Sequence, residues 1–296
     1  MKMTHNEHPK IAVLLAAYNG MQWIEEQIDT IFNQQDVDVT IYISVDLSTD
    51  GTYEWAEQLA EKHTNVALLP YGERFGGAGP NFFRLIKDVD VSGFDAFSFA
   101  DQDDIWHPEK LAKAYSKIAT GQCDVYSSNV TAFWADDREC LIKKSQPQKK
   151  LDHFFEAAGP GCTYVFSQKS ILSFQRFLIK SGSGLNKVEL HDWLAYAFCR
   201  ESGFKWFIDD WSSMRYRQHE NNQVGTNNSF AAYKKRFSMI KNKWLRKQVN
   251  AIIVLVAPAK LEMINSRLFL IRHSTELRRN LRDRLFLLVM IFLGIY

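Results

Sequence analysis

FSFADQDDIW, residues 97 to 106, joins an apolar segment directly to three carboxylates and a tryptophan. The spacing Asp101-x-Asp103 at a strand end lets two carboxylates share a hard cation and leaves coordination positions for phosphate oxygens. That arrangement is typical of a Mg²⁺ or Mn²⁺ site that binds a nucleotide. Asp104 can instead cap the helix whose start is predicted by His107-Pro108-Glu109. A cap accounts for only one acid, so the stretch predicts a divalent metal site.

The segments around this stretch alternate between strands and helices. Apolar runs predict strands at 11–15, 39–45, 66–69 and 94–99, and helical spacing predicts helices at 21–32, 52–62 and 80–87. This alternation predicts an α/β, Rossmann-like nucleotide-binding fold with a mainly parallel sheet flanked by helices on both faces. Ligands of such sheets bind beyond the carboxyl ends of the strands. The three carboxylates follow one of these ends.

Two more strand ends carry informative loops. The first reads Ala16-Ala17-Tyr18-Asn19-Gly20 and contains neither G-x-G-x-x-G nor G-x-x-x-x-G-K-[ST], which argues against dinucleotide oxidoreductases and P-loop proteins. It also lacks the glycine-rich loop with Arg and Lys that sugar nucleotidyltransferases carry here. The second strand ends at Asp46, and Ser48 or Asp50 can cap the next helix. Asp46 is not needed for capping, so we expect it to accept a hydrogen bond from the N3–H of a pyrimidine base.

In order and spacing, three segments resemble glycosyltransferase family 2: Ala17-Tyr18-Asn19-Gly20, DLSTDGT at 46–52 and DQDDIWHPEK at 101–110. The similarity covers roughly residues 10 to 225 and is strongest to bacterial rhamnosyltransferase-like members that build surface polysaccharides. It implies a GT-A fold, a nucleoside-diphosphate sugar donor, a divalent metal (Mg²⁺ or Mn²⁺) and inversion at the anomeric carbon. It also implies that Asp101 and Asp103 form the metal pair, with Asp103 the direct ligand. The donor contacts expected in this half are Ala17, Tyr18, Asn19, Asp46, Asp101 and Gln102.

The second half is expected to bind the acceptor and supply the base. AGPGCTYVF, residues 158–166, is a glycine-rich turn that lets the backbone approach a ligand, although an ordinary turn is the alternative. His191-Asp192-Trp193 opens a helix that runs to about Arg200, at the place where the family carries Glu-Asp before an aromatic residue. The resemblance implies that Asp192 is the general base, and a helix cap is the alternative. The expected acceptor contacts are Trp106, Gly161, Cys162, His191 and Trp193.

In SMRYRQHENN, residues 213–222, the side chains alternate in character as they do along a strand, and the segment ends in a polar loop. It resembles the family's Arg-x-His-x-x-Asn element. Arg215 and Arg217 suit a diphosphate because guanidinium groups bind phosphate oxygens in pairs. A neutral His219 can ligate a metal. We therefore expect these three residues at the donor site, with His219 as a metal ligand beside Asp101 and Asp103. A solvated basic strand is the alternative.

The C-terminal region differs in charge from the rest of the chain. From Ala231 to Tyr296 there are 14 Lys and Arg against three acids, a net +11, so the remainder carries −9 of the total +2. Apolar residues at helical spacing, interrupted at Pro258, predict basic amphipathic helices that suit an anionic membrane surface. The last of these stripes runs from Leu277 to Phe292 and includes Arg278 and Arg279. Packing on the catalytic core or on a partner subunit are alternatives. A nucleic-acid partner is disfavoured because these cations flank aliphatic rather than stacking aromatic side chains.

The apolar segments are short, and the cysteines are scattered. No stretch reaches the roughly 18 apolar residues of a spanning helix, and the uncharged run Leu285 to Tyr296 has 12. Cys123, Cys140, Cys162 and Cys199 include no C-x-x-C pair, so neither a zinc site nor a disulfide framework is indicated. A reducing cytosol is the default compartment.

These observations define an expected organisation and activity. Residues 1–229 are expected to form the GT-A domain, with a donor half (1–110) and an acceptor half (111–229), and residues 230–296 a helical region that binds membrane or forms a homo-oligomer. By resemblance, the chain transfers L-rhamnose from dTDP-L-rhamnose to a lipid-linked oligosaccharide of an O-antigen or other surface polysaccharide. It is expected at the cytoplasmic face of a bacterial membrane, as a peripheral protein. A UDP-hexose transferase of the same fold and a non-catalytic sugar-nucleotide-binding module remain alternatives.

Overall fold

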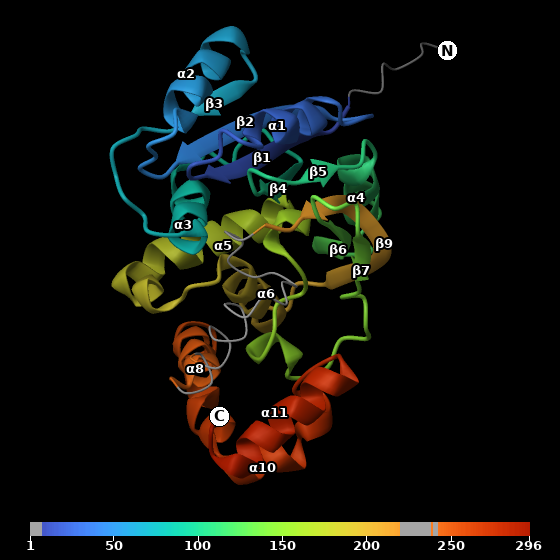
Figure 1. Cartoon of the computed structure of the whole chain (residues 1–296). Coiled ribbons are helices and arrows are strands. Elements are labelled where there is room, and N and C mark those ends of the chain that lie inside the picture. Colours follow the sequence, from blue (N-terminus) through green and yellow to red (C-terminus); the bar gives the residue numbers. More distant parts are fainter. Residues whose placement is uncertain (1–7, 220–237, 239–241) are drawn as a thin grey trace.

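The computed structural model describes residues 8–219, 238 and 242–296, shown as ribbons in Figure 1. The first half alternates strands and helices in the predicted order: β1 (Lys10–Ala17), α1 (Ile24–Phe32), β2 (Asp38–Val45), α2 (Thr52–Lys62), β3 (Val66–Leu68), α3 (Ala78–Asp88), β4 (Ala96–Ala100), β5 (Ile105–Trp106) and α4 (Lys110–Ala119). Helix α1 begins at Ile24 rather than at the predicted Met21. The carbonyl of Gly20 accepts the N–H groups of both Trp23 and Ile24, so the intervening residues form a turn.

The second half supplies further helices and strands of both directions. In chain order these are β6 (Val125–Phe133), β7 (Glu139–Ile142), the 3₁₀ turns η1 (Asp152–Phe154) and η2 (Gly161–Thr163), β8 (Val165–Ser167), α5 (Gln168–Ser181), η3 (Gly182–Lys187), α6 (His191–Glu201) and β9 (Trp206–Arg217). Strands β6 and β9 are parallel to each other, and β8 is antiparallel to β6. The predicted helix at His191 is confirmed, and it ends one residue after the predicted Arg200.

The strands form one mixed sheet in the order β3-β2-β1-β4-β8-β6-β9-β5, with β7 paired to β6. Strands β3, β2, β1 and β4 are mutually parallel, as predicted, whereas β8 is antiparallel to β4 and β6. Register pairs Ala17 with Val45, and Leu15 with Ala100. The carboxyl ends of β1, β2 and β4 therefore meet at one edge of the sheet.

Both faces of this sheet are covered. Along β1, Ala12 and Leu14 belong to one buried apolar cluster, while Val13 and Leu15 belong to the other, because neighbouring side chains of a strand point to opposite faces. Helix α3 contributes Phe82, Leu85 and Ile86 to the first cluster, and α1 contributes Ile24, Ile28 and Ile31 to the second. The two helices therefore lie on opposite faces of the sheet, as the alternating pattern predicted.

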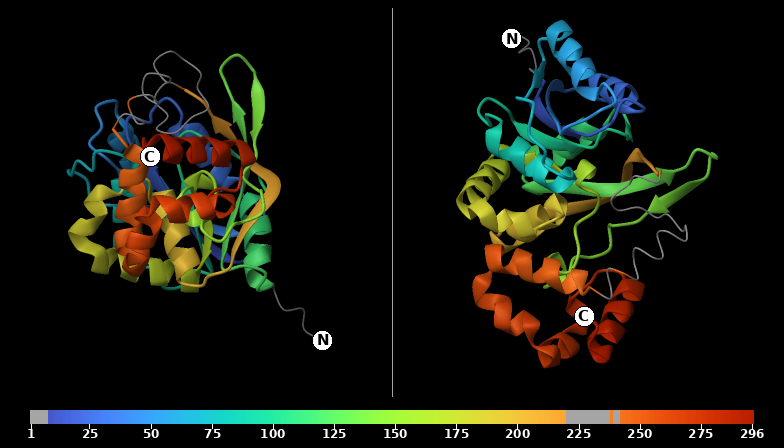
Figure 2. Two further views of the ribbon diagram at one scale, coloured as in Figure 1. Left: turned by 90° about the horizontal axis from the view of Figure 1, so that it is seen from below. Right: turned by 60° about the vertical axis from the view of Figure 1, so that its left-hand side comes forward.

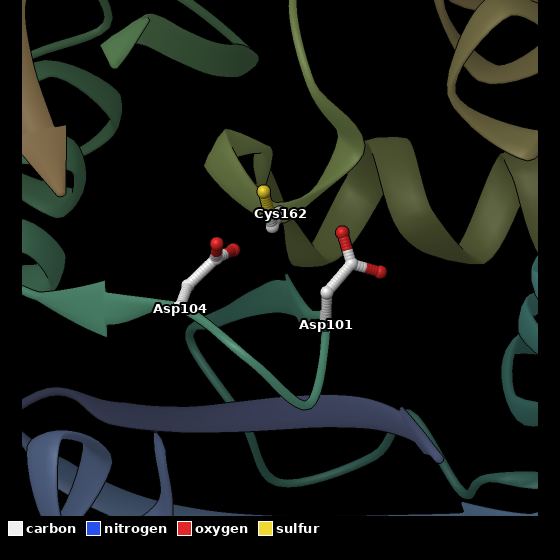
Figure 3. A group of neighbouring side chains, drawn as sticks. All are labelled: Asp101, Asp104 and Cys162. Atoms are coloured by element: carbon white, nitrogen blue, oxygen red, sulfur yellow. The ribbon is translucent and has the colours of Figure 1, made fainter. Parts of the chain in front are cut away.

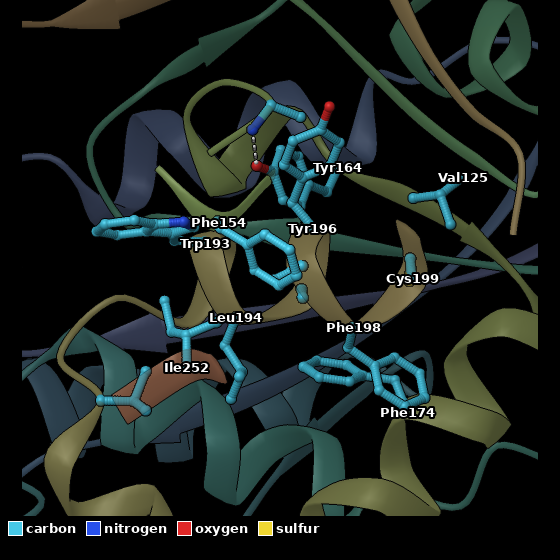
Figure 4. Close-up of a cluster of buried hydrophobic side chains, with 14 of the residues drawn as sticks. Val125, Phe154, Tyr164, Phe174, Trp193, Leu194, Tyr196, Phe198, Cys199 and Ile252 are labelled. Carbon is cyan, nitrogen blue, oxygen red and sulfur yellow. Dashed lines mark hydrogen bonds between the residues drawn. The ribbon is translucent and has the colours of Figure 1, made fainter. Parts of the chain in front are cut away.

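The C-terminal region is helical: α8 (Trp244–Val256), η4 (Pro258–Lys260), α9 (Leu261–Asn265), α10 (Arg267–Arg272), η5 (Ser274–Glu276) and α11 (Leu281–Leu293). These helices lie at the opposite end of the molecule from α2 (Figures 1 and 2). Their inward side chains, including Ile252 and Leu287, belong to the same buried cluster as α3 and α6. Figure 4 shows Ile252 beside Leu194 of α6. Of the three surfaces considered for this region (membrane, catalytic core and partner subunit), its inward side therefore packs on the catalytic core.

The prediction that Arg278 and Arg279 lie on the terminal amphipathic helix is wrong. Asn280 is the N-cap of α11, its side chain accepting the N–H of Arg282, so both arginines precede the helix. Arg279 is buried, and its guanidinium makes an ion pair with Asp152 over 3.0 Å. That ion pair joins the C-terminal region to η1 in the acceptor half.

None of the helices in the described ranges is long and apolar enough to cross a membrane.

Candidate active site

The loop after β1 is fixed to the carboxylate loop by one side chain. The Gln102 amide accepts the N–H of Tyr18 over 2.8 Å and donates to the Tyr18 carbonyl over 2.9 Å. A Cβ at Gly20 would collide with the same amide, so a larger residue there would displace Gln102 from these hydrogen bonds. Asn19 adopts φ of 44° and its side-chain oxygen accepts the N–H of Thr49, which ties in the loop after β2. Tyr18, about half exposed, is thus presented at the rim of the site.

Asp46 directly follows the end of β2, as the sequence indicated, and its side chain is buried. Its carboxylate accepts backbone N–H groups from Leu47, Phe75 and Gly76 over 2.8 to 2.9 Å. It thereby tethers the segment before α3 across the strand end. The expected contact between Asp46 and a pyrimidine base stays a prediction.

Three acidic groups converge beyond β4. Ligand atoms of Asp101, Asp104 and Cys162 lie within 4.8 Å of one another, and Figure 3 shows both carboxylates on the same side of the loop as the thiol. Burial and the nearby Asp103 raise the pKa of Asp101 to about 7. The same causes raise the pKa of Asp104 well above its usual range, and burial does so for the Cys162 thiol. A cation bound among these groups would favour their ionised forms and lower these pKa values.

The interpretation of Asp104 as the cap of α4 is wrong. Helix α4 starts at Lys110 and has no side-chain cap. Asp104 instead directly precedes the extended pair Ile105–Trp106, and alternation along a strand places it on the same side as buried Trp106. Its carboxylate turns inward, where Oδ1 accepts the N–H of Arg217 over 3.4 Å.

A buried lysine lies below this cluster. The Lys110 ammonium, with no exposed surface, stands 2.9 Å from the centroid of the Trp106 ring and 3.4 Å from the Ser98 hydroxyl. Burial lowers the pKa of Lys110 well below its usual range. Trp106, expected beside the acceptor, thus has its ring against this lysine in the interior.

Asp103 is held apart from that cluster, next to His219. Its Oδ2 lies 2.7 Å from His219 Nε2, and the imidazole is stacked on the Trp23 ring at 4.1 Å. The structure therefore brings together two of the three predicted metal ligands, one from the β4–β5 loop and one from the end of β9. A carboxylate oxygen and an imidazole nitrogen are donors that suit Mn²⁺ or Mg²⁺.

The two arginines of β9 have protein partners. Arg217 donates to the Asp103 carbonyl over 2.9 Å and pairs with Glu26 of α1, so it braces the carboxylate loop. Arg215 pairs with Glu139 of β7 over 2.9 Å, farther from the carboxylates in the sheet. Their contact with a diphosphate stays a prediction. Asn222, the last residue of the motif, lies outside the described residues.

Asp192 occupies the first turn of α6, close to η2. Its Oδ1 accepts the N–H of Trp193 over 2.7 Å, and burial raises the pKa of Asp192 to about 6. A Cβ at Gly161 would collide with the His191 ring and lie 3.1 Å from the Asp192 Cβ. Because Cys162 follows Gly161 directly, this glycine lets Asp192 stand beside the acidic cluster. A carboxylate of this pKa can accept a proton near neutral pH.

His191 and Trp193 flank this carboxylate as interior residues. The His191 imidazole is stacked on Phe82 at 3.9 Å, and burial lowers its pKa to about 3, so the ring is neutral. The Trp193 indole donates to the carbonyl of His153 over 3.0 Å. Both rings therefore pack the base of the helix, and their contact with an acceptor stays a prediction.

Comparisons with known proteins show the family and the fold of this chain. The family described as "Glycosyl transferase family 2" matches residues 12–171. The dTDP-rhamnosyl transferase RfbG of Shigella flexneri is 42% identical over 291 residues, which cover 95% of this chain and 100% of that protein. Staphylococcus aureus TarS 1–349 in complex with UDP superposes with a TM-score of 0.57 at 15% identity, over 90% of this chain and 72% of that one.

A second solved structure extends the similarity in fold. The mannosyltransferase PcManGT of Pyrobaculum calidifontis, in complex with GDP-Man and Mn²⁺, superposes with a TM-score of 0.53 at 16% identity, over 98% of this chain and 82% of that one. With a matching family over half its length and a relative of high identity over nearly all of it, this chain belongs to glycosyltransferase family 2 and has the GT-A fold.

Proposed function

We propose that this enzyme transfers L-rhamnose from dTDP-L-rhamnose, with inversion, to a lipid-linked oligosaccharide of an O-antigen or other surface polysaccharide. The observation that carries the proposal is a buried carboxylate, Asp192, with a pKa of about 6, brought beside the acidic cluster by the close approach at Gly161. The identity of the donor sugar is supported by the 42% identity to a dTDP-rhamnosyl transferase over almost the whole chain.

In this proposal the two groups of carboxylates have separate roles. Asp192 accepts the proton of an acceptor hydroxyl while that oxygen attacks the anomeric carbon from the face opposite the dTDP group. The bond between the anomeric carbon and the diphosphate oxygen breaks, dTDP leaves, and the proton stays on Asp192. Asp103 and His219, with Asp101, would hold a divalent metal. When bound, that ion supplies positive charge opposite the diphosphate.

The donor is tested with a panel of nucleotide sugars. Purified protein, supplied with Mn²⁺ and acceptor, is expected to release nucleoside diphosphate from dTDP-L-rhamnose at least tenfold faster than from UDP-glucose or UDP-galactose. Faster turnover of a UDP-hexose would favour the UDP-hexose alternative. Tight binding of a donor by the folded protein, without turnover of any acceptor or water, would favour the non-catalytic alternative.

We also propose that the outward side of α11 rests on an anionic membrane at the cytoplasmic face. Its apolar side chains are each more than half exposed: Leu281, Leu285, Phe286, Val289, Phe292 and Leu293. Exposed arginines stand near both ends of this face, with Arg282 at the start of α11 and Arg267 bonded to the carbonyl of Phe292 near its end. Apolar burial and attraction to anionic lipid act together on such a surface.

A lipid surface fits this face better than a second copy of the chain. Helix α11 has 13 residues and is therefore about 20 Å long. One side of a helix of that length is small beside the roughly 800 Å² that each partner contributes to a standard protein interface. The flanking cations would also repel their counterparts across a symmetric dimer.

Replacing Phe286 and Val289 together with Ser is expected to reduce binding to phosphatidylglycerol-containing vesicles by at least tenfold. Both side chains point outward, so the fold is expected to stay intact. The matched control is Leu141→Ser, because Leu141 is a similarly exposed apolar residue on β7. Wild-type binding, measured by co-sedimentation, should fall as salt rises. Equal binding to neutral vesicles, or a concentration-dependent dimer that the double variant abolishes, would contradict the proposal.

A further inference from the structure

The segment that leads into α6 is held from the C-terminal region. Gln248 of α8, almost fully buried, accepts the N–H of Glu189 over 3.0 Å and donates to the Lys187 carbonyl over 3.2 Å. Its amide also reaches one Glu189 carboxylate oxygen at 3.2 Å, and the Trp244 indole N–H donates to the other at 2.9 Å. Helix α8 thus binds the backbone and the side chain of a residue three positions before Asp192.

The opposite side of the same segment is closed by α3. A Cβ at Gly79 would collide with the carbonyl of Glu189, so the first turn of α3 lies directly against this backbone. One turn farther along α3, Phe82 carries the stacked His191 ring. The segment before Asp192 is therefore confined between α3 and α8.

This confinement matters because α6 has no cap of its own. Its N-cap residue is Leu190, which makes no side-chain hydrogen bond to the helix. An uncapped helix start frays more readily than a capped one, so its position depends on neighbouring contacts. The first turn of α6 carries Asp192, and a shift of about 1 Å in a reacting group can cost on the order of 100-fold in rate.

We propose that Gln248 and Trp244 are positioning residues for catalysis: they fix Glu189 and thereby the place of Asp192. The inference rests on the proposed role of Asp192 as the base. It assigns the C-terminal region a second task besides the proposed membrane contact, because α8, the helix that fixes Glu189, belongs to that region. Neither residue touches a reacting atom in this mechanism.

The test compares Gln248→Met, which keeps the volume and removes the amide, with Lys247→Ala, an exposed residue of the same helix. Gln248→Met is expected to lower kcat about 10- to 100-fold, with donor KM unchanged, whereas Lys247→Ala keeps the wild-type kcat. Because burial raises the pKa of Asp192, a looser helix start should also move the acid limb of the kcat profile to lower pH. A purely structural role would leave that limb in place.

Trp244→Phe keeps the ring and removes one hydrogen-bond donor, so it decides the question if Gln248→Met does not fold. It is expected to lower kcat at least threefold with the same direction of pH shift. Wild-type kcat and pH profile in a folded Gln248→Met, or in Trp244→Phe when Gln248→Met is unfolded, would overturn the inference. That result together with an inactive Asp192→Asn would leave the proposed function standing, whereas an active Asp192→Asn would refute the base itself.

Discussion

Replacing Asp192 with Asn is expected to lower kcat by about 100-fold or more and to leave donor affinity unchanged. The change keeps the shape of the side chain and the hydrogen bond from the Trp193 N–H, but it removes the group that accepts the acceptor's proton. General-base catalysis typically contributes about 10²- to 10⁴-fold. The measurement is kcat with a saturating acceptor, beside donor binding by calorimetry. Asp136→Asn is the matched control, because its carboxylate is exposed and pairs with Arg138 rather than with a proposed site residue.

The pH dependence provides a second signature of the same residue. Burial raises the pKa of Asp192 to about 6, so the carboxylate is protonated below that pH and cannot accept a proton. The kcat of the wild type should therefore fall as pH falls through about 6, or somewhat lower when a bound cation favours the charged form. The residual activity of Asp192→Asn should lack this limb. A fully active Asp192→Asn would place the base elsewhere.

Sequence patterns were sufficient for the arrangement of the nucleotide-binding half. Apolar runs and helical spacing located β1, β2 and β4 and the helices between them, because each element buries a full face against the sheet. The motifs also placed Asp103 and His219 together across 116 positions. Such long-range pairing was not visible in the periodicity, and the family resemblance supplied it.

Asp104 shows where local patterns were insufficient. Asp followed by a short stretch and His-Pro-Glu suggests a helix start, yet the two intervening residues pair with β9 as a strand. A strand of two residues leaves almost no periodic signal. The buried Trp106, two positions after Asp104, was the available indication that this carboxylate points inward. The sequence likewise did not indicate that Lys110, at the start of a predicted helix, is buried near the acidic side chains.

The C-terminal region illustrates a different limit. Its apolar spacing was read as one stripe that included Leu277 and the adjacent arginines, but the helix starts only after Asn280. An Asn three positions after Leu277 was a usable N-cap signal. The inward role of Arg279 depends on Asp152, more than 120 residues away, and no local pattern encodes that pairing.

Removal of the divalent metal, or of the carboxylate expected to bind it, should abolish turnover. Asp103→Ala is expected to reduce kcat by at least about 1,000-fold, and EDTA should do the same to the wild type, because positive charge opposite a leaving diphosphate is usually among the largest catalytic terms. Activity should return when Mn²⁺ is added to the EDTA-treated wild type but not when it is added to the variant. Full activity in metal-free buffer would contradict the prediction.

The control for this experiment follows from the two sets of acidic groups. Asp103 faces His219, whereas Asp101 faces Asp104 and Cys162. If the ion is held by Asp103 and His219, Cys162→Ser should keep the Mn²⁺ dependence and most of the activity, and His219→Ala should weaken Mn²⁺ binding measured by calorimetry. If Asp103→Ala instead stays active while Cys162→Ser loses Mn²⁺ binding, the ion lies among Asp101, Asp104 and Cys162. The spacing Asp101-x-x-Asp104, rather than Asp101-x-Asp103, would then be the one that binds the metal.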